Sequence, residues 1–202
     1  MSMPFSPLAA WRRWQAMREW GARGFAAPSP DHVKHTVLLR LSLPGSTWVE
    51  TGTYRGETTA LLAGVSRRVV SLESAPALHA AAVARFAGQP HVQILNATSE
   101  QAFGTLLPSI DGPVCFWLDG HFSGGPTFKG PNDTPVLHEL DVIGTQLARW
   151  PQVRVLVDDL RLFTGEVHAY GPYPPLRVLV DWAEAQGLAW HIEHDIFVAA
   201  KG

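Results

Sequence analysis

The stretch WVETGTYRGETT, residues 48–59, decides the fold. An apolar strand ends here in an acid, a loop then carries two glycines four residues apart, and a helix opens. Glycine lets a backbone adopt a positive φ or pass very close to a ligand, so this loop predicts a cofactor contact. An acid at the strand end suits a positively charged ligand, because phosphate-binding loops present bare N–H groups and no carboxylate.

Short apolar runs alternate with helical patterns beyond this loop, which is typical of βαβ units and a parallel sheet. Expected strands cover residues 47–51, 68–72, 91–95, 114–118 and 153–157. Expected helices cover about 57–64 and 176–187; another begins at 74–76 and stops at Gly88, a third opens at residues 98–101, and a long one follows Thr134-Pro135. Thr98 opens the third of these with the spacing of a capping box. The last stretch, 188–200, divides at His194-Asp195 into two runs that favour an antiparallel strand pair.

The composition predicts one globular α/β domain. The chain has 202 residues, of which 46% are hydrophobic, enough for a sizeable core. A net charge of −2 argues against a general nucleic-acid binder, which would usually be basic. The single cysteine, Cys115, lies in an apolar run and is interpreted as a small buried hydrophobe. An intramolecular disulfide is therefore impossible, and a reducing cytoplasm is the expected location.

Residues 1–44 are expected to form an N-terminal helical extension before an α/β domain over 45–202. Within it, large apolar side chains recur at helical spacing with arginines between them: Leu8, Trp11, Trp14 and Met17. Such a helix could lie on a membrane surface. Exposed apolar patches more often mark protein contacts, so we expect it to pack on this domain or to join two copies in a dimer. No apolar stretch approaches the ~20 residues that span a bilayer.

Three expected strand ends carry chemically distinctive residues in a fixed order. Residues 50–56 combine an acid with glycines, Glu73 follows the second strand 17 residues beyond Gly56, and residues 96–99 follow the third. These features resemble the class I S-adenosylmethionine-dependent methyltransferases. In that family the first motif lines the methionine end of the cofactor, the second acid holds the ribose hydroxyls, and the third segment contacts the adenine.

The resemblance covers about residues 45–200 and implies a fold. This is a Rossmann-like, doubly wound, mostly parallel seven-stranded sheet with an antiparallel last strand and helices on both faces. The cofactor-binding residues that it implies are Glu50, Thr51, Gly52, Thr53, Tyr54, Gly56, Thr58, Glu73, Ser74, Ser99 and Asp119. A nicotinamide-binding Rossmann domain is the main alternative, but its fingerprint needs G-x-G-x-x-G. Thr53 and Tyr54 follow Gly52, so the second close-approach glycine is missing.

Asp119, Asp158 and Asp159 follow the expected strands 114–118 and 153–157. This resembles the divalent-metal-dependent O-methyltransferases, both of the catechol type and of the antibiotic-sugar type related to macrocin O-methyltransferase. If the two strands are neighbours, their ends lie ~5 Å apart, and without a cation one of three converging carboxylates would hold a proton. Mg²⁺ prefers such oxygen ligands, so the sequence predicts a magnesium site at these aspartates.

A hydroxyl bound to Mg²⁺ would ionise more readily and lie in line with the methyl group. The catechol-type enzymes use a lysine three residues after the first aspartate as base, but that position is Phe122 here. His121 is the expected proton acceptor instead, since its unperturbed pKa is near neutrality. This departure favours the sugar-type interpretation.

The sequence therefore predicts a cytoplasmic, S-adenosylmethionine-dependent O-methyltransferase that uses Mg²⁺. Its expected substrate is a hydroxylated small molecule, such as a sugar or another polar metabolite, and not a nucleic acid. Catalysis is assigned to Asp119 and His121. Two alternatives stay open, because fold does not fix chemistry: a non-catalytic module that keeps the cofactor pocket, or a different enzyme on the same scaffold.

Overall fold

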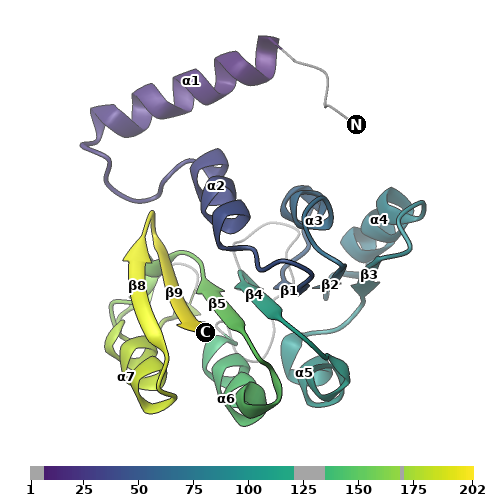
Figure 1. Cartoon of the computed structure of the whole chain (residues 1–202). Coiled ribbons are helices and arrows are strands. Elements are labelled where there is room, and N and C mark those ends of the chain that lie inside the picture. The colour runs from purple at the N-terminus through teal and green to yellow at the C-terminus, as the bar shows by residue number, and fades with distance from the viewer. Residues whose placement is uncertain (1–6, 121–134, 169–170) are drawn as a thin grey trace.

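A seven-stranded sheet runs through the middle of the described chain, with helices on both of its faces (Figure 1). The computed structural model describes residues 7–120, 135–168 and 171–202. The strands of the sheet are β1 (Thr47–Thr51), β2 (Arg68–Leu72), β3 (Val92–Leu95), β4 (Val114–Leu118), β5 (Val153–Val157), β8 (Ala189–Glu193) and β9 (Ile196–Lys201). The helices are α1 (Pro7–Ala22), α2 (Asp31–Leu41), α3 (Glu57–Ala63), α4 (Pro76–Phe86), α5 (Ser99–Leu106), α6 (Val136–Gln146) and α7 (Arg177–Ala185). β6 (Val167–His168) and β7 (Gly171–Pro172) form a separate short ribbon.

The strand order is β3-β2-β1-β4-β5-β9-β8. All pairs from β3 to β5 are parallel, whereas β9 runs antiparallel to both of its neighbours. The predicted fold class is therefore confirmed, including the antiparallel last strand. Its cause is the strand-and-helix alternation, since a parallel pair needs a crossover that helices provide.

Alternate residues of the central strands face two different hydrophobic clusters. Val49 and Phe116 join the cluster that α5, α6 and α7 cover, whereas Trp48 and Cys115 join the cluster beneath α2 and α3. This alternation follows from the period of two along a strand, and it explains why these strands are apolar throughout. Cys115 is buried, as interpreted from its sequence context.

The two N-terminal helices differ in how they meet the sheet. α2 contributes Val37 and Leu38 to the core, although both fall in the segment expected to be an extension. α1 has only Trp20 buried among its 16 residues, and it stands away from the sheet (Figure 1). Among the described residues, none of the helices combines the length and the hydrophobicity that crossing a bilayer requires.

Candidate active site

The strand order reverses between β1 and β4. β2 and β3 lie on one side of this boundary, and β4 and β5 lie on the other. Open α/β sheets bind ligands outside the carboxyl ends of their strands at such a switch point. The register Thr51↔Leu118 brings Gly52 and Asp119 side by side, and the Asp119 amide donates a hydrogen bond to the Thr51 carbonyl oxygen at 3.2 Å.

A pocket of about 330 Å³ opens at this switch point, which is a size typical of small-molecule sites. The loop after β1, the ends of β4 and β5, and the first half of α2 form its walls. The lining residues are Asp31, Lys34, His35, Gly52, Thr53, Tyr54, Arg55, Glu57, Thr58, Trp117, Asp119 and Asp158. Five predicted cofactor contacts, four of them in the loop and start of α3 and one at Asp119, thus share one pocket.

The glycines of the loop permit close contact between the ends of β1 and β4. Gly52 has φ +89°, and a Cβ on it would lie 2.6 Å from the Asp119 carbonyl oxygen. A Cβ on Gly120 would lie 2.9 Å from Thr51 Cβ. At Gly52 the backbone of the loop after β1 therefore lies close to the backbone of the loop after β4. The close approach of Gly52 to a cofactor stays a prediction.

Glu50, expected at the methionine end of the cofactor, is fully buried. Its Oε2 accepts hydrogen bonds from Thr59 Oγ1 and Ser71 Oγ, both at 2.5 Å. Burial raises the pKa of Glu50 to about 7, although the two hydroxyls act in the opposite direction. The carboxyl group connects β1 with α3 and β2 through these hydrogen bonds. Glu50 is not among the residues that line the pocket, so its direct contact with a cofactor stays a prediction.

Glu73 connects the loop after β1 to the ends of β2 and β3. Its Oε2 accepts a hydrogen bond from the Tyr54 amide at 2.8 Å, and its Oε1 accepts one from the Ala75 amide at 2.9 Å. The Asn96 side-chain amide donates to the carbonyl oxygens of Glu73 and Ser74. Because carboxylate oxygens carry further lone pairs, Glu73 keeps the capacity to accept hydroxyl donors, and its contact with the ribose of a cofactor stays a prediction.

Thr51 and Ser99, whose cofactor contacts stay predictions, both form hydrogen bonds with a buried acid of α6. This acid is Glu139, whose burial raises its pKa to about 7 while hydrogen bonds from Ser99 and Thr51 oppose the shift. Glu139 is not among the site residues predicted from the sequence. The available signal was its position, because it lies three residues after Val136 and four before Ile143, on the apolar stripe of the predicted helix.

The remaining predicted residues hold the loop and α3 in place. Gly56 caps α3 with φ +72°, and a Cβ there would meet the Phe86 ring at 2.8 Å. Thr53 Oγ1 lies 2.6 Å from Ser71 Oγ. Thr58 Oγ1 lies 3.5 Å from Nε2 of His35.

Asp158 and Asp159, the expected metal ligands, are paired with a lysine. Lys34 Nζ of α2 lies 2.5 Å from Asp158 Oδ1 and 3.0 Å from Asp159 Oδ1. Burial alone would lower the pKa of Lys34, but the two carboxylates outweigh it and raise that pKa above its usual value. Burial raises the pKa of Asp158 to about 6 against the opposing effect of Lys34, so the pair is ionised at pH 7.

Arg161 and Asp195 complete this ion cluster, by which we mean Lys34, Asp158, Asp159, Arg161 and Asp195. Arg161 Nη1 lies 2.6 Å from Asp159 Oδ1 and also pairs with Asp195. Within residues 7–120, 135–168 and 171–202, no group of three His, Cys, Asp or Glu side chains is placed to hold a metal ion. The expected magnesium site therefore receives no support, because ammonium and guanidinium groups already face two of its three expected ligands, Asp158 and Asp159.

Lys34 is not among the site residues predicted from the sequence, because it lies 124 residues before Asp158. His35, its neighbour on α2, also lines the pocket. Burial lowers the pKa of His35, with Arg13 and His32 acting in the same direction and Asp31 and Glu57 in the opposite one. His35 is therefore neutral at pH 7. His121, the predicted proton acceptor, lies outside the described residues.

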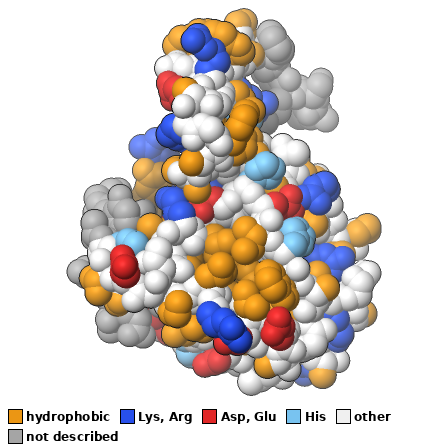
Figure 2. Space-filling model, turned by 90° about the vertical axis from the view of Figure 1, so that its left-hand side faces the viewer, with side chains coloured by type: hydrophobic (Ala, Val, Ile, Leu, Met, Phe, Trp, Pro, Cys, Tyr) orange, Lys and Arg blue, Asp and Glu red, His pale blue; other side chains and the backbone are white. Residues whose placement is uncertain are grey.

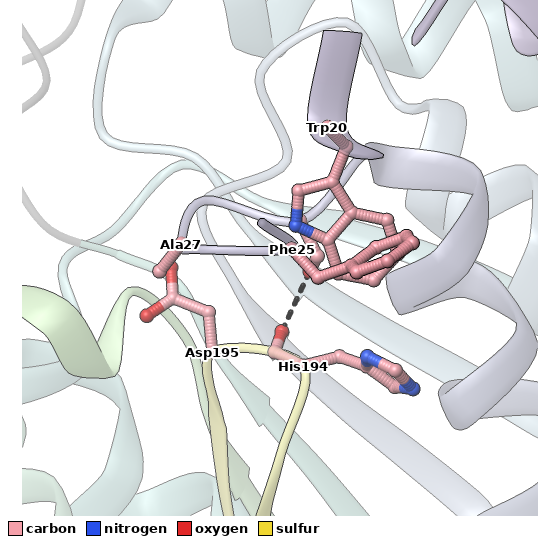
Figure 3. A pocket seen from close by; sticks show the side chains of 6 residues that line it. Trp20, Phe25, Ala27, His194 and Asp195 are labelled. Atoms are coloured by element: carbon pink, nitrogen blue, oxygen red, sulfur yellow. Dashed lines mark hydrogen bonds between the residues drawn. The ribbon is translucent and has the colours of Figure 1, made fainter. Parts of the chain in front are cut away.

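A second pocket, of about 430 Å³, lies between the segment after α1 and the β8–β9 turn (Figure 3). Its ring cluster has Trp20 edge-on to Phe25 and to His194, with ring centroids 5.1 and 5.6 Å apart. The Ser29 hydroxyl donates a hydrogen bond to the His194 carbonyl oxygen at 2.7 Å. These contacts hold the chain before α2 against the turn that carries Asp195.

Comparison with known proteins gives similarity of structure and not of sequence. No family model matches the chain, and no curated protein matches it. The N-methyltransferase NodS from Bradyrhizobium japonicum superimposes with a TM-score of 0.55 at 15% identity, over 84% of this chain and 94% of that one. A putative rRNA methylase from Clostridium thermocellum gives 0.52 at 12% identity, over 84% and 94%. The YcgJ protein from Bacillus subtilis gives 0.54 at 11% identity, over 79% and 70%.

The chain has the class I methyltransferase fold. At these identities the likeness establishes the fold alone. The magnesium-dependent subtype receives no support from the described residues.

Proposed function

We propose that the protein is a cytoplasmic S-adenosylmethionine-dependent methyltransferase that acts on a hydroxyl oxygen of a sugar or another small polar metabolite. The observation that carries this proposal is the charge of the pocket at the switch point. Its described lining has four carboxylates, of Asp31, Glu57, Asp119 and Asp158, against the cations Lys34 and Arg55. Four against two leaves an excess of two negative charges, which suits a ligand with a sulfonium and an ammonium group.

The chain's residues have separable tasks in this proposal. The backbone of the loop at Gly52–Tyr54 and the carboxylate of Asp119 would hold the methionine end of the cofactor, and Glu73 would accept the ribose hydroxyls. When bound, the cofactor would supply a methyl group on a positively charged sulfur. The bond from this sulfur to the methyl carbon would break as the acceptor oxygen bonds to that carbon, leaving a neutral thioether. Neutral His35 lines the pocket and can accept the hydroxyl proton, and His121 is retained as the candidate predicted from the sequence.

The proposed methyl acceptor is based on the charge of the pocket and on the family resemblance of the sequence. Solved structures with this fold include an N-methyltransferase and a putative rRNA methylase. A polyanionic RNA would meet the acidic lining of the pocket and a chain of net charge −2, which disfavours it electrostatically. A small hydroxylated acceptor carries no such penalty. We also propose that α1 joins two copies in a homodimer.

Calorimetric titration with S-adenosylmethionine tests the proposal. We expect binding with a dissociation constant of about 1 μM to 1 mM, the usual range of KM values, and no comparable heat with NAD. Asp119→Asn should weaken this binding about tenfold or more, because it removes a charge-assisted contact. Asp181→Asn, on the exposed surface of α7, is the matched control and should bind as the wild type does.

Methyl transfer from labelled S-adenosylmethionine to a panel of sugars, phenols, amines and rRNA then identifies the acceptor class. Transfer to a hydroxylated small molecule supports the proposal, and transfer to an amine or to rRNA overturns its acceptor. Cofactor binding without transfer to any panel member identifies a non-catalytic module. Absence of cofactor binding overturns the proposal altogether.

A further inference from the structure

Two members of the ion cluster, Lys34 and Asp158, line the candidate active site where α2 meets the end of β5. Asp158 leaves β5 next to Asp119, because the register pairs Leu118 with Val157, and the Asp158 amide donates a hydrogen bond to the Leu118 carbonyl oxygen at 3.1 Å. Both aspartates line the pocket, and so does Lys34. The Lys34 side chain is only 9% exposed. A largely buried ammonium therefore faces the pocket beside two strand-end carboxylates.

The Lys34 ammonium and a divalent cation would compete for the same oxygens. Nζ contacts Oδ1 of Asp158 at 2.5 Å and Oδ1 of Asp159 at 3.0 Å. Mg²⁺ would need ligand oxygens at about 2.0–2.1 Å, from atoms that the ammonium already occupies. Removing one partner from a buried ion pair leaves an uncompensated charge and is strongly destabilising, so an ion could enter only by displacing Lys34 from its carboxylates.

One N–H of Lys34 remains available to a ligand. A lysine ammonium carries three donors, and two of them are used on Asp158 and Asp159. The third charged neighbour, Asp195 Oδ2, lies 3.9 Å away, which is beyond hydrogen-bond distance. No other hydrogen bond from Nζ occurs to the described part of the chain.

The contacts of α2 fix the ammonium in this position. Asp158 and Asp159 hold it from one side, and the same helix packs Val37 and Leu38 into the core. Ser29, just before α2, is tied to the β8–β9 turn that carries Asp195 (Figure 3). A cation held from several directions is preorganised, so that little side-chain freedom is lost when it binds a ligand.

We infer that Lys34 is the built-in cation of this site: it takes the place that a divalent metal would occupy at Asp158 and Asp159, and its third N–H binds an oxygen atom of the methyl acceptor. The inference rests on the proposed function for the identity of the ligand, but its statement about metals stands on the cluster alone. Lys34 is accordingly a substrate-positioning residue, and the reaction proceeds without a divalent ion at this edge of the sheet.

Titration with Mn²⁺ tests the metal half without any knowledge of the substrate. Free Mn²⁺, followed by electron paramagnetic resonance up to about 1 mM, should behave alike with wild type and with Asp158→Asn, because Lys34 excludes the ion from both. Lys34→Met should gain Mn²⁺ binding, since it removes the ammonium from Asp158 while Asp159 stays paired with Arg161, and Mn²⁺ should raise its melting temperature. Saturable binding by the wild type that Asp158→Asn abolishes would overturn the inference.

Lys34→Arg keeps a positive charge at this position and provides a second variant in case Lys34→Met does not fold. It should fold and show no gain of Mn²⁺ binding. If Lys34→Met does not fold, the comparison of wild type with Asp158→Asn still decides the question. Arg40→Met is the matched control, because it removes an exposed cation of the same helix that pairs with Glu193; it should leave Mn²⁺ behaviour unchanged.

The acceptor half is tested by separating the two ligands. With the acceptor found in the transfer screen, Lys34→Met should raise the KM for the acceptor about tenfold to a hundredfold, the effect of losing one charge-assisted hydrogen bond. The S-adenosylmethionine dissociation constant should change less than about twofold. An unchanged acceptor KM overturns this half. Failure of the wild type to bind S-adenosylmethionine overturns the proposed function and leaves the Mn²⁺ result standing.

Discussion

Two glutamates behind the candidate site are fully enclosed by the protein. Glu50 is 0% and Glu139 is 1% exposed, and burial raises the pKa of each to about 7. Burial away from water disfavours the charged form of a carboxyl group relative to its neutral form. Hydroxyl groups of Thr59 and Ser71 beside Glu50, and of Ser99 and Thr51 beside Glu139, oppose that effect without cancelling it.

Because of these two residues, we expect the free energy of unfolding to fall as pH rises. A carboxyl group whose pKa is higher in the folded than in the unfolded chain stabilises the fold fully below its unfolded pKa, near 4.5, and loses that contribution as pH rises through about 7. Between pH 5.5 and pH 8 the loss is about 2 kcal/mol for each glutamate. Urea unfolding at both pH values should show this slope, and Glu50→Gln combined with Glu139→Gln should flatten it.

Glu184→Gln is the control for this experiment, because Glu184 is exposed on α7. It should keep the wild-type slope. A wild-type free energy of unfolding that rises between pH 5.5 and pH 8, or a double variant with an undiminished slope, would contradict the assignment of neutral glutamates to the wall of the site.

At the scale of elements, the junction of β1 and β4 depends on a residue without a side chain. Gly52→Ala would place a Cβ 2.6 Å from the Asp119 carbonyl oxygen and force alanine to φ +89°. The left-handed backbone alone costs roughly 1–2 kcal/mol, and the backbone contact adds to it. We expect a loss of about 2 kcal/mol or more in the free energy of unfolding, and weaker S-adenosylmethionine binding, because Asp119 must move.

Gly104→Ala is the informative counterpart, since nothing lies within 4 Å of a Cβ built on Gly104 in α5. The same chemical change in a helix interior should stabilise the protein by about 0.5–1 kcal/mol. Denaturant unfolding of the two variants therefore gives opposite signs. Equal changes in the free energy of unfolding for the two variants would show that the junction at Gly52 tolerates a side chain.

The elements were predictable from local signals and the site only partly so. Strands 47–51, 68–72, 114–118 and 153–157 have the bounds expected from their apolar runs, and the capping box of Thr98 with Gln101 is present. Lys34 lies 124 residues from Asp158, and no local pattern marks a lysine that will be buried against an acid. The predicted magnesium site gained no support for this reason: the prediction was based on the carboxylates alone, and Lys34 comes from a helix distant in sequence.

At the scale of the whole molecule, the N-terminal segment has two parts with different roles. α2 is built into the hydrophobic core and lines the pocket, so the α/β unit is incomplete without it. In the part of the chain that the structure describes, Trp20 is the one fully buried residue of α1, and the helix projects from the top of the molecule with apolar and arginine side chains exposed (Figure 2).

The dimer is the last prediction, and it concerns the exposed face of α1. Trp11 and Trp14 are each 55% exposed, and large aromatic side chains of this kind are the usual anchors of protein interfaces. Sedimentation velocity should show a dimer of the wild type. Trp11→Ala combined with Trp14→Ala should weaken dimerisation about tenfold or more while S-adenosylmethionine affinity stays the same. Val83→Ala, an exposed apolar residue of α4, is the control and should remain dimeric. A wild type that is monomeric in solution but binds anionic lipid vesicles through Trp11 and Trp14 would replace the dimer with a membrane-surface helix, for which the arginines among these tryptophans provide the charge.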